Sequence, residues 1–498
     1  MSTVSIRDGP IPQRTPLPKL QLFIIFLIQL AEPITATVIF PFVNQAVRDT
    51  GIINGDERKT GYYAGLIGSV FFFAEAVTVF HWGWISDRLG RRPILLLGPL
   101  GLASAMFSFG LSKGFIPMVV SRAIQGVFNG NLGVAKTVIA EITDSSNIAD
   151  AYAIMPMTWS TGATLGPIIG GLLSQPADRW PRLFGNQFFH THPYFLPCAV
   201  AGLLAFLSAA IAFFGLKESL PSKQKKHLSQ EEQLEVHSTT PLLVQDATNY
   251  GSNDPPPKAD DTSPAPFSAL LIPQVLIPIL VYMMIAFVDM SSITLLPLVY
   301  STSIPVGGLG LDAYHIGILL SIFGFVNALV QLFLLGKFIR RFGPRRICMA
   351  AQISYFLNAA LYPVLIGFAR RAGYVDLKTW MVVAAQLVLR LTNGMAWGVY
   401  IHRSFLLLEK LTESTLGSIQ VIIVDSAPSR ASLGATNGMA QAVGCIARSI
   451  GPSLASSLFS VTLERNSAGG NMVYIVLAGC ALSGLALTFI LPQKLRQS

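Results

Sequence analysis

The sequence predicts an all-α membrane protein in which twelve transmembrane helices form two six-helix bundles. Of its 498 residues, 52% are hydrophobic and only 12% are charged, whereas about 25% of the residues of an ordinary soluble protein are charged. Apolar runs of roughly twenty residues, long enough to cross a bilayer as helices, recur along the chain. A short segment rich in glycine and arginine also occurs twice, once in each half.

This repeated segment defines the two halves. Residues 82–93 read Trp-Gly-Trp-Ile-Ser-Asp-Arg-Leu-Gly-Arg-Arg-Pro, and residues 336–346 are an altered copy. The glycines of the copies pair at a single separation of 253 residues: Gly83 with Gly336, and Gly90 with Gly343. Asp87 aligns with Arg340, so the two copies have the same glycine spacing but opposite charges at this position. We expect tight turns on the cytoplasmic side, because clustered arginine in a short loop is typical of that side.

The first copy is expected to act as a conformational latch on the cytoplasmic face. Its residues are Gly83, Asp87, Arg88, Gly90, Arg91 and Arg92. Asp87 would bind Arg91 or Arg92 and the start of the eleventh helix near Leu433, where the halves meet when the cavity opens outward. A buried charge-assisted contact of about 1.5–3 kcal/mol would shift the balance of conformations about tenfold or more.

The first half, residues 21–216, contains six apolar segments that we predict as helices. They cover about residues 22–43, 61–80, 94–111, 115–140, 153–174 and 194–216. The preceding residues 1–20 hold three basic residues and four prolines, so we expect a cytoplasmic tail. Residues 217–269 combine proline, serine and charged residues without apolar periodicity. This composition predicts a disordered cytoplasmic linker.

The second half, residues 270–492, repeats the scheme. Its helices are predicted at about residues 272–300, 316–338, 347–368, from 380, 433–463 and 472–491, before a cytoplasmic tail at 493–498. An Arg-x-x-x-Gly-x-x-x-Gly pattern begins at Arg122 and occurs again at Arg390, 268 residues later. The Gly-Pro pairs that begin at Gly166 and Gly451 are 285 residues apart, so the separation between equivalent positions increases between the two motifs. Removing the 19 residues 399–417 reduces that separation to 266 (285−19).

Residues 399–417 are therefore predicted to be an insertion in the tenth helix. Two interpretations stay open: a retained intron in the gene model, or a real loop or interfacial helix on the cytoplasmic side. Sequencing of cDNA across the junction separates them.

Composition excludes several classes of function. The net charge of +9 and the pI near 9.4 suggest nucleic-acid binding, but the basic residues lie in short loops between apolar spans, as membrane topology requires. We therefore expect no nucleic-acid partner. The four cysteines lie in apolar spans without metal-type spacing, so no metal site is expected. Motifs of nucleotide sites and of enzymes are missing, which predicts no enzymatic activity, no cofactor and an ion gradient as energy source.

Charged residues within the apolar segments are the candidates for a functional site, because a charge at membrane depth is costly and normally faces a cavity or a partner. Glu32 and Asp289 precede Pro41 and Pro297 by nine and eight residues. We expect these two acids to face each other across a central cavity and to couple proton movement. The alternatives are binding of a cationic substrate and structural ion pairing. Further charges lie at Glu75, Arg122, Lys136, Arg390 and Arg448.

Two groups of motifs resemble a known family. The segment 82–93 is similar to the signature loop between helices two and three of the major facilitator superfamily. Together with Ala31-Glu32-Pro33 in the first helix and Leu196-Pro197-Cys198 in the sixth, it resembles zinc-induced-facilitator-like transporters and their fungal relatives. The resemblance implies the major facilitator fold. It also implies a role in proton transfer for Arg122, with Arg390 as its counterpart; a structural pair with a carboxylate is the alternative.

The fifth predicted helix contains a second motif of this kind. Gly162, Gly166, Pro167, Gly170 and Gly171 resemble the fifth-helix motif of drug/proton antiporters, which implies exchange rather than uniport. Small residues at this spacing also permit close helix packing, and packing alone is the alternative.

These observations predict a secondary active transporter working by alternating access, most simply a proton-coupled antiporter for a small organic molecule or a metal chelate. A proton symporter importing a peptide, siderophore or other nutrient is one alternative, and a non-transporting membrane sensor is another. The expected partners are the substrate, protons and the lipid bilayer, and we expect a monomer. Both termini should be cytoplasmic, in a vacuolar or plasma membrane.

Overall fold

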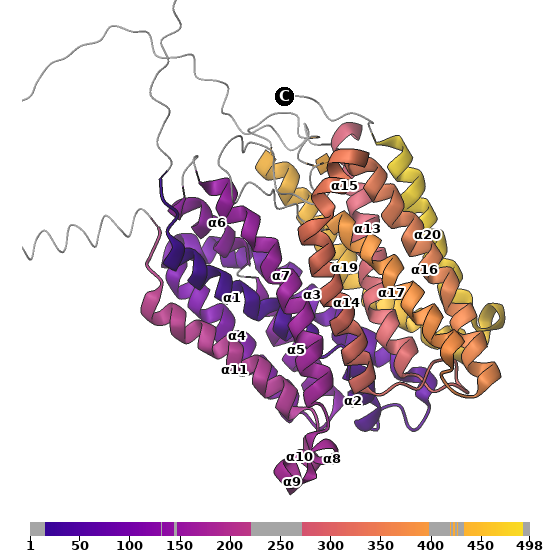
Figure 1. The fold of residues 1–498 in the computed structure, drawn as a ribbon. Helices are drawn as coiled ribbons and strands as arrows, with labels where there is room; N and C mark the ends of the chain where they lie inside the picture. Colours follow the sequence, from indigo (N-terminus) through magenta and orange to yellow (C-terminus); the bar gives the residue numbers. More distant parts are fainter. Residues whose placement is uncertain are drawn as a thin grey trace, which may run out of the picture.

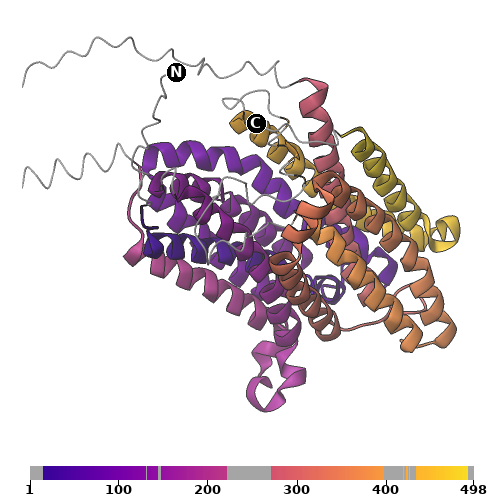
Figure 2. The same ribbon diagram turned by 45° about the horizontal axis from the view of Figure 1, so that its top comes forward.

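The computed structural model describes residues 15–130, 132–143, 147–220, 271–397, 419, 422–423, 426 and 433–491. Most of the predicted linker, the predicted insertion at 399–417, most of the predicted N-terminal tail and all of the predicted C-terminal tail lie outside these residues. Every regular element in the described part of the chain is a helix. The helices of the first half lie beside those of the second, and the views in Figures 1 and 2 agree on this division.

The spanning helices of the first half follow the predicted order with shifted bounds. They are α1 (Lys19–Thr37), α3 (Thr60–Leu89), α4 (Arg91–Leu111), α5 (Phe115–Asn129) with α6 (Leu132–Ile142), α7 (Ile148–Leu173) and α11 (Phe195–Gly215). The short helices are α2 (Val43–Asp49), the 3₁₀ helix η1 (Glu57–Lys59), α8 (Pro176–Arg179), α9 (Pro181–Phe184) and α10 (Gln187–Thr191).

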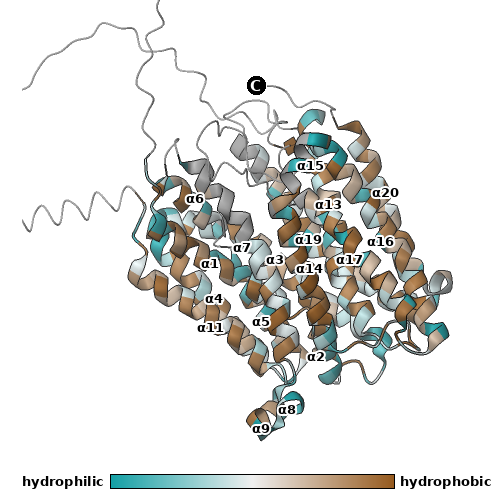
Figure 3. Cartoon of the chain, viewed as in Figure 1, coloured by the Kyte–Doolittle hydropathy of each residue, from teal (hydrophilic) through white to brown (hydrophobic). Residues whose placement is uncertain are grey.

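The second half repeats this arrangement. Its helices are α13 (Pro273–Ser301), α14 (Ala313–Phe333), α15 (Leu335–Phe342), α16 (Pro344–Ala372), α17 (Leu377–Trp397), α19 (Leu433–Glu464), the 3₁₀ helix η5 (Ser467–Gly470) and α20 (Met472–Ile490). Eight helices in the described residues are long and apolar enough to cross a membrane. Apolar residues cover much of the helix length, and polar residues gather at ends such as α2 and α15 (Figure 3). The apolar cores of the two halves are separate clusters, apart from Ala313 of α14, which packs into a core of the first half.

The segment 82–93 is not a loop, contrary to the prediction. Helix α3 continues to Leu89, Gly90 alone makes the turn with φ 105° and ψ 161°, and α4 begins at Arg91. The second copy behaves in the same way, since Gly343 with φ 77° separates α15 from α16. A positive φ is readily available only to glycine, which explains why the two repeats keep a glycine at this position. The polar residues of the segment extend a membrane helix rather than interrupt it.

The fourth predicted helix is divided into α5 and α6 by a tertiary contact. Trp82 of α3 donates its indole N–H to the Val127 carbonyl at 2.6 Å, and Thr78 donates to the same carbonyl at 3.3 Å. The Trp82 indole also lies directly over Gly130. The first predicted helix is likewise shorter than expected, because α1 ends at Thr37 and turns connect it to α2.

The halves meet along two antiparallel helix pairs, α3 with α19 and α7 with α14. Along the first pair, a Cβ at Gly61 would touch Ser456 and Ser460, while one at Gly68 would touch Pro452 at 3.2 Å. Glycine is needed at position 61 because the Ser456 backbone approaches too closely for a side chain. We call the two ends of the bundle the α2 end and the Gly90 end.

Candidate functional site

Glu32 lies in a buried cluster of charged residues in the first half. It is on α1, with an exposed fraction of 7%, and accepts a hydrogen bond from Asn129 Nδ2 of α5 at 2.9 Å. Its charged neighbours are Glu75 of α3, Lys136 of α6 and Arg448 of α19. Lys136 is exposed, so one member of the cluster is accessible from outside the protein while Glu32 is buried. This position suits a group that must meet both protein charges and a small molecule.

Asp289 lies in the matching place of the second half. It is on α13 and accepts a hydrogen bond from Tyr355 Oη of α16 at 2.8 Å. Arg390 and Arg448 are its charged neighbours. Arg448 therefore interacts electrostatically with both predicted coupling acids. Whether the two acids face each other across a cavity stays a prediction.

The two predicted proton-transfer arginines are buried within their own halves. Arg122 is 1% exposed, donates from Nη1 to Gln125 Oε1 at 2.5 Å and lies 4.6 Å over the Phe71 ring. Arg390 is 7% exposed and donates to the Ser292 carbonyl at 3.2 Å. Within the described part of the chain, the partner of Arg122 is Gln125 rather than Glu32. Its role in proton transfer stays a prediction.

The predicted latch is an ion-pair network inside the first half. Arg91 donates from Nη1 to Asp87 Oδ1 at 2.5 Å and from Nε and Nη2 to Glu141 Oε1 at 3.1 and 3.0 Å. The Arg91 side chain is 9% exposed, whereas that of Asp87 is 64% exposed. Arg88 stacks on Trp84 of its own helix at 3.8 Å. The predicted pairing of Asp87 with Arg91 is therefore present, but Asp87 is exposed and not buried as predicted. The side chain of Leu433 lies outside the described residues.

Arg92 does not bind Asp87 but joins α4 to the end of α11. Its Nη2 donates to the Phe213 carbonyl at 2.6 Å. The second half reproduces this contact, because Arg345 Nη2 donates to the Phe489 carbonyl at the end of α20 at 2.6 Å. The two arginines are 253 residues apart, the separation of the repeat. Each arginine supplies positive charge to a helix C-terminus, where the helix dipole favours it.

The small-residue motif of α7 packs against both α1 and the second half. A Cβ at Gly162 would meet Pro33 of α1 at 2.9 Å. A Cβ at Gly166 would lie 3.0 Å from the backbone nitrogen of Val38, and a Cβ at Gly170 would lie 2.9 Å from the carbonyl carbon of the same residue. Gly171 faces α14, where a Cβ would lie 2.6 Å from the Gly317 Cα. The close packing predicted for this motif is present, and it includes a contact between the halves.

Polar contacts close the α2 end. They are Arg48 with Glu57 at 3.2 Å, Arg48 with the Ser301 carbonyl at 3.2 Å, Glu57 with Ser303 Oγ at 2.5 Å, and Tyr62 with Glu464 at 3.0 Å. All except the Arg48–Glu57 pair join the first half to the second. Alternating access would require these contacts to break when the other conformation forms.

A further ion pair at the α2 end involves Asp312, just before α14. Asp312 Oδ2 lies 3.9 Å from Arg179 Nη2 of α8, and its Oδ1 accepts from the backbone N–H and Nδ1 of His315. Partial burial opposes ionisation of Asp312, but the two His315 hydrogen bonds and the nearby charges outweigh it and lower its pKa. Asp312 is thus ionised and available to Arg179 at neutral pH.

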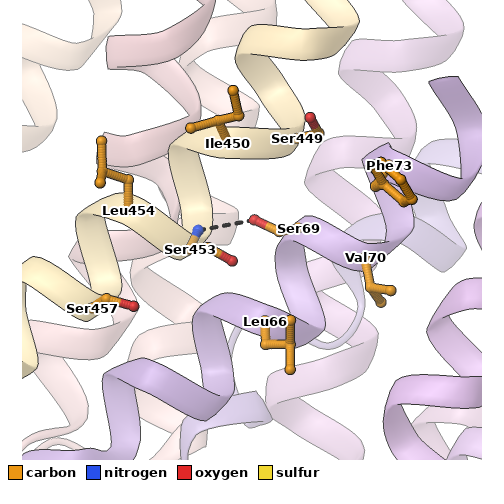
Figure 4. A pocket seen from close by; sticks show the side chains of 9 residues that line it. All are labelled: Leu66, Ser69, Val70, Phe73, Ser449, Ile450, Ser453, Leu454 and Ser457. Atoms are coloured by element: carbon orange, nitrogen blue, oxygen red, sulfur yellow. Dashed lines mark hydrogen bonds between the residues drawn. The ribbon is translucent and has the colours of Figure 1, made fainter.

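At the crossing of α3 and α19, a groove of about 500 Å³ is lined by side chains of both helices. Figure 4 shows the hydrogen bond that joins the halves there, from the Ser453 backbone N–H to Ser69 Oγ at 2.9 Å. Ser453 directly follows Pro452, which lies inside α19. Proline distorts the helix around it and leaves backbone groups free to bond elsewhere. A serine of the other half satisfies one of them.

Sequence reasoning marked Glu75, Lys136 and Arg448 as charges at membrane depth but did not assign them to the site. The only signal for them was an ionisable residue in an apolar segment. Asn129 and Tyr355, which bind the two acids, were missed altogether, because uncharged polar residues are too common in membrane helices to be distinctive.

Comparison with known proteins agrees with this architecture. Residues 23–452 match the model of the Major Facilitator Superfamily. The chain is 31% identical to the major facilitator-type transporter psiT2 of Psilocybe cyanescens, over 95% of this chain and 90% of the relative. It is 30% identical to the multidrug transporter mfsB of Aspergillus fumigatus, over 90% of this chain and 79% of the relative. It is 27% identical to the protein ZINC INDUCED FACILITATOR 1 of Arabidopsis thaliana, over 95% and 91%.

Solved structures show the same fold. A D-xylose-proton symporter aligns with a TM-score of 0.67 at 14% identity, over 97% of this chain and 100% of the other. A bacterial homologue of the lysosomal transporter Spinster aligns with a TM-score of 0.62 at 16% identity, over 96% and 97%. The family match and the apolar helices identify a multi-pass membrane transporter for small molecules rather than an enzyme. The chain belongs to the Major Facilitator Superfamily.

Proposed function

We propose that the protein is a proton-coupled antiporter that exports or sequesters a small organic molecule or a metal chelate. The observation that carries this proposal is the buried carboxylate Glu32, which accepts a hydrogen bond from Asn129 and has Arg448 of the other half among its charged neighbours, as Asp289 does. A buried carboxylate that is ionised and unpaired is costly, so such a group readily binds a proton or a cationic partner. Proton and substrate can therefore exclude one another at one site, which is the requirement for exchange.

The motif of α7 and the name of one relative support exchange. The small-residue motif of α7 resembles that of drug/proton antiporters, and one relative is named a multidrug transporter. Transport would proceed by rocking of the two halves about the central site, with both termini on the cytoplasmic side. The protein would act as a monomer in a vacuolar or plasma membrane.

The test is transport by reconstituted protein, with a panel of fluorescent cationic, neutral and anionic compounds and of metal chelates. A pH gradient should drive accumulation opposite to the proton flow. Glu32→Gln keeps the size of the side chain and the acceptor for Asn129 but removes the titration. This variant should lose gradient-driven accumulation and retain exchange of substrate without a gradient.

Glu464→Gln is the matched control, since it makes the same chemical change at the α2 end, where Glu464 binds Tyr62. It should still accumulate substrate. Wild-type accumulation by both Glu32→Gln and Asp289→Asn would place the coupling elsewhere. Accumulation in the direction of proton flow would instead identify a symporter.

A further inference from the structure

The short helices α8, α9 and α10 connect α7 to α11 and project beyond the α2 end (Figure 1). The backbone N–H of Gln175 donates to the Pro193 carbonyl at 2.9 Å, which closes the base of this connection. Phe188 of α10 packs edge-on against Phe195 at the start of α11, with ring centres 5.0 Å apart. These contacts all lie within the first half, so they hold Arg179 of α8 in a fixed place relative to α7 and α11.

Arg179 binds both halves through one guanidinium group. Its Nη1 donates to the carbonyls of Gly171 and Leu172 in the last turn of α7, at 3.1 and 3.2 Å. A cation is favoured at a helix C-terminus by the helix dipole. On the other side, Nη2 lies 3.9 Å from Asp312 Oδ2, and the guanidinium carbon lies 4.4 Å from the centre of the Tyr314 ring. Arg179 thus connects the end of α7 to the start of α14.

The backbones of α7 and α14 approach most closely beside this arginine. Gly171, whose carbonyl accepts from Arg179, faces Gly317 so closely that a Cβ would lie 2.6 Å from the Gly317 Cα. Opening of the α2 end must separate these helices. The bonds from Arg179 to α7 lie within the first half and can persist, whereas its contacts with Asp312 and Tyr314 must break. We call these two contacts between the halves the Arg179 lock.

His315 shares the carboxylate of Asp312 with Arg179. Oδ1 of Asp312 accepts from the His315 backbone N–H at 3.0 Å and from the imidazole Nδ1. Because an ionised carboxylate can only accept, Nδ1 carries a hydrogen and Nε2 is the nitrogen that takes a further proton. Imidazole is the side chain whose charge ordinarily changes between about pH 5 and pH 8. The Asp312 and His315 side chains are 54% and 55% exposed, so water reaches both.

We propose that Arg179 is the positioning residue that keeps α7 and α14 together at the α2 end, and that protonation of His315 weakens this lock. A proton from water binds Nε2, and the resulting imidazolium balances the charge of Asp312 and repels Arg179. Asp312 and His315 lie at the same end of α14, so their contact survives opening while that of Arg179 is lost. Acid at the α2 end therefore favours opening at that end.

The physiological sense of the lock rests on the proposed antiport. With the Gly90 end in the cytoplasm, the α2 end faces the compartment from which protons enter. A lock that acid weakens would open the transporter toward that compartment when protons are available there. The lock itself lies at the protein surface, away from Glu32, and therefore adjusts the conformational equilibrium without carrying the transported proton.

The groups that surround His315 and Arg179 assign the titration to the imidazole. They are Asp312 and Tyr314 of the second half, while α7 contributes the Gly171 and Leu172 carbonyls, which do not titrate. Partial burial raises the pKa of Asp312, but the hydrogen bonds from His315 outweigh this effect, so the pKa lies below its ordinary value. The carboxylate therefore stays charged in mild acid, when an imidazole gains its proton.

The test measures opening of the α2 end and needs no substrate. Labels introduced through non-natural amino acids at Lys113 and Tyr374, exposed positions of the two halves, report the distance across this end. His315→Asn keeps an amide nitrogen at the same number of bonds from Cα as Nδ1, but it does not titrate. Acidification from about pH 8 to about pH 5.5 should favour opening up to about fivefold more in wild type than in this variant. His190→Asn, the same change at another exposed histidine of this end, should keep the wild-type response.

Arg179→Gln should favour opening by up to about fivefold at neutral pH, whereas Arg182→Gln, the matched control at an exposed arginine of α9, should not. In the Arg179→Gln background, His315→Asn should no longer change the pH response, because the two side chains act on one carboxylate. A purely structural role of His315 would leave its effect the same in both backgrounds.

Three results would overturn the lock: equal pH responses of wild type and His315→Asn, an effect of His315→Asn that persists without Arg179, or equal opening of Arg179→Gln and Arg182→Gln. Asp312→Asn checks the same carboxylate without loss of the helix cap, since asparagine caps helices as well as aspartate does; it should behave as Arg179→Gln does. Failure of the antiport proposal would appear separately, as wild-type protein that accumulates no substrate against a proton gradient while its labels still respond to pH.

Discussion

Arg91 connects four segments of the first half at the Gly90 end. Its side chain binds Asp87 of α3 and Glu141 of α6, and its backbone N–H donates to Glu218 at 2.8 Å. The Glu141 side chain is 18% exposed, whereas that of Asp87 is 64% exposed. Exposed ion pairs contribute about 0.2–1 kcal/mol, and buried charged hydrogen bonds about 1.5–3 kcal/mol. Glu141 should therefore stabilise the fold, which leaves Asp87 free to act in conformational change.

We predict that substitutions at these two acids separate stability from turnover. Asp87→Asn should reduce turnover but lower the free energy of unfolding by less than about 1 kcal/mol. Glu141→Gln should lower it by about 1.5–3 kcal/mol, because Arg91 and Ser219 both bind this carboxylate. Thermal unfolding of purified protein and transport rates in vesicles measure the two effects. Normal transport by Asp87→Asn would exclude a latch at this residue.

At the scale of elements, the helix order could be predicted from apolar run length, but two features could not. The polar end of α3 was taken for a loop, because composition alone does not distinguish a helix that projects from the membrane from a turn. The division of α5 from α6 depends on Trp82, a residue 45 positions away from Val127 in the sequence. Local propensity carries no information about such a tertiary contact. Helix existence was therefore easier to predict than helix bounds.

The contact of α7 with α14 gives a prediction about how the halves pack. Gly171→Ala places a methyl group 2.6 Å from the Gly317 Cα and should destabilise this conformation by about 1–3 kcal/mol. Gly367→Ala in α16 is the control, because a Cβ there has no atom within 4 Å and alanine favours a helix by up to about 1 kcal/mol. Thermal unfolding should show a lower melting temperature than wild type for Gly171→Ala and a higher one for Gly367→Ala. Equal behaviour would show that α7 and α14 do not need this close approach.

At the scale of the molecule, the bonds that hold the halves together join residues far apart in the sequence. Arg48 and Ser301 are separated by 253 positions, and Tyr62 and Glu464 by 402. The repeat predicted two bundles with a site between them. It could not predict which residues pair across the interface, because equivalent positions differ in charge, as Asp87 and Arg340 do. Arg448 illustrates this limit, because the first half has no arginine at the equivalent position that would have indicated a role for it.

The boundary between the first half and the linker differs from the predicted one at residue 217. Glu218 accepts from the backbone N–H groups of Arg91 and Arg92 at 2.8 and 3.2 Å, and Ser219 donates to Glu141 at 2.5 Å. Residues 217–220 thus pack against the first half. The carboxylate of Glu218 lies at the N-terminus of α4, where the helix dipole favours a negative charge.

This boundary gives a prediction for the chain cut in two. The predicted linker is too polar to bury enough apolar surface to offset the entropy of ordering it, and the halves already meet along α3 with α19 and α7 with α14. Coexpressed fragments 1–220 and 270–498 should therefore assemble and retain transport. The fragment 1–216 lacks Glu218 and Ser219 and should be less stable by about 1.5–3 kcal/mol, with lower yield and melting temperature. Loss of transport by both pairs despite membrane insertion would mean that the linker does more than connect the halves.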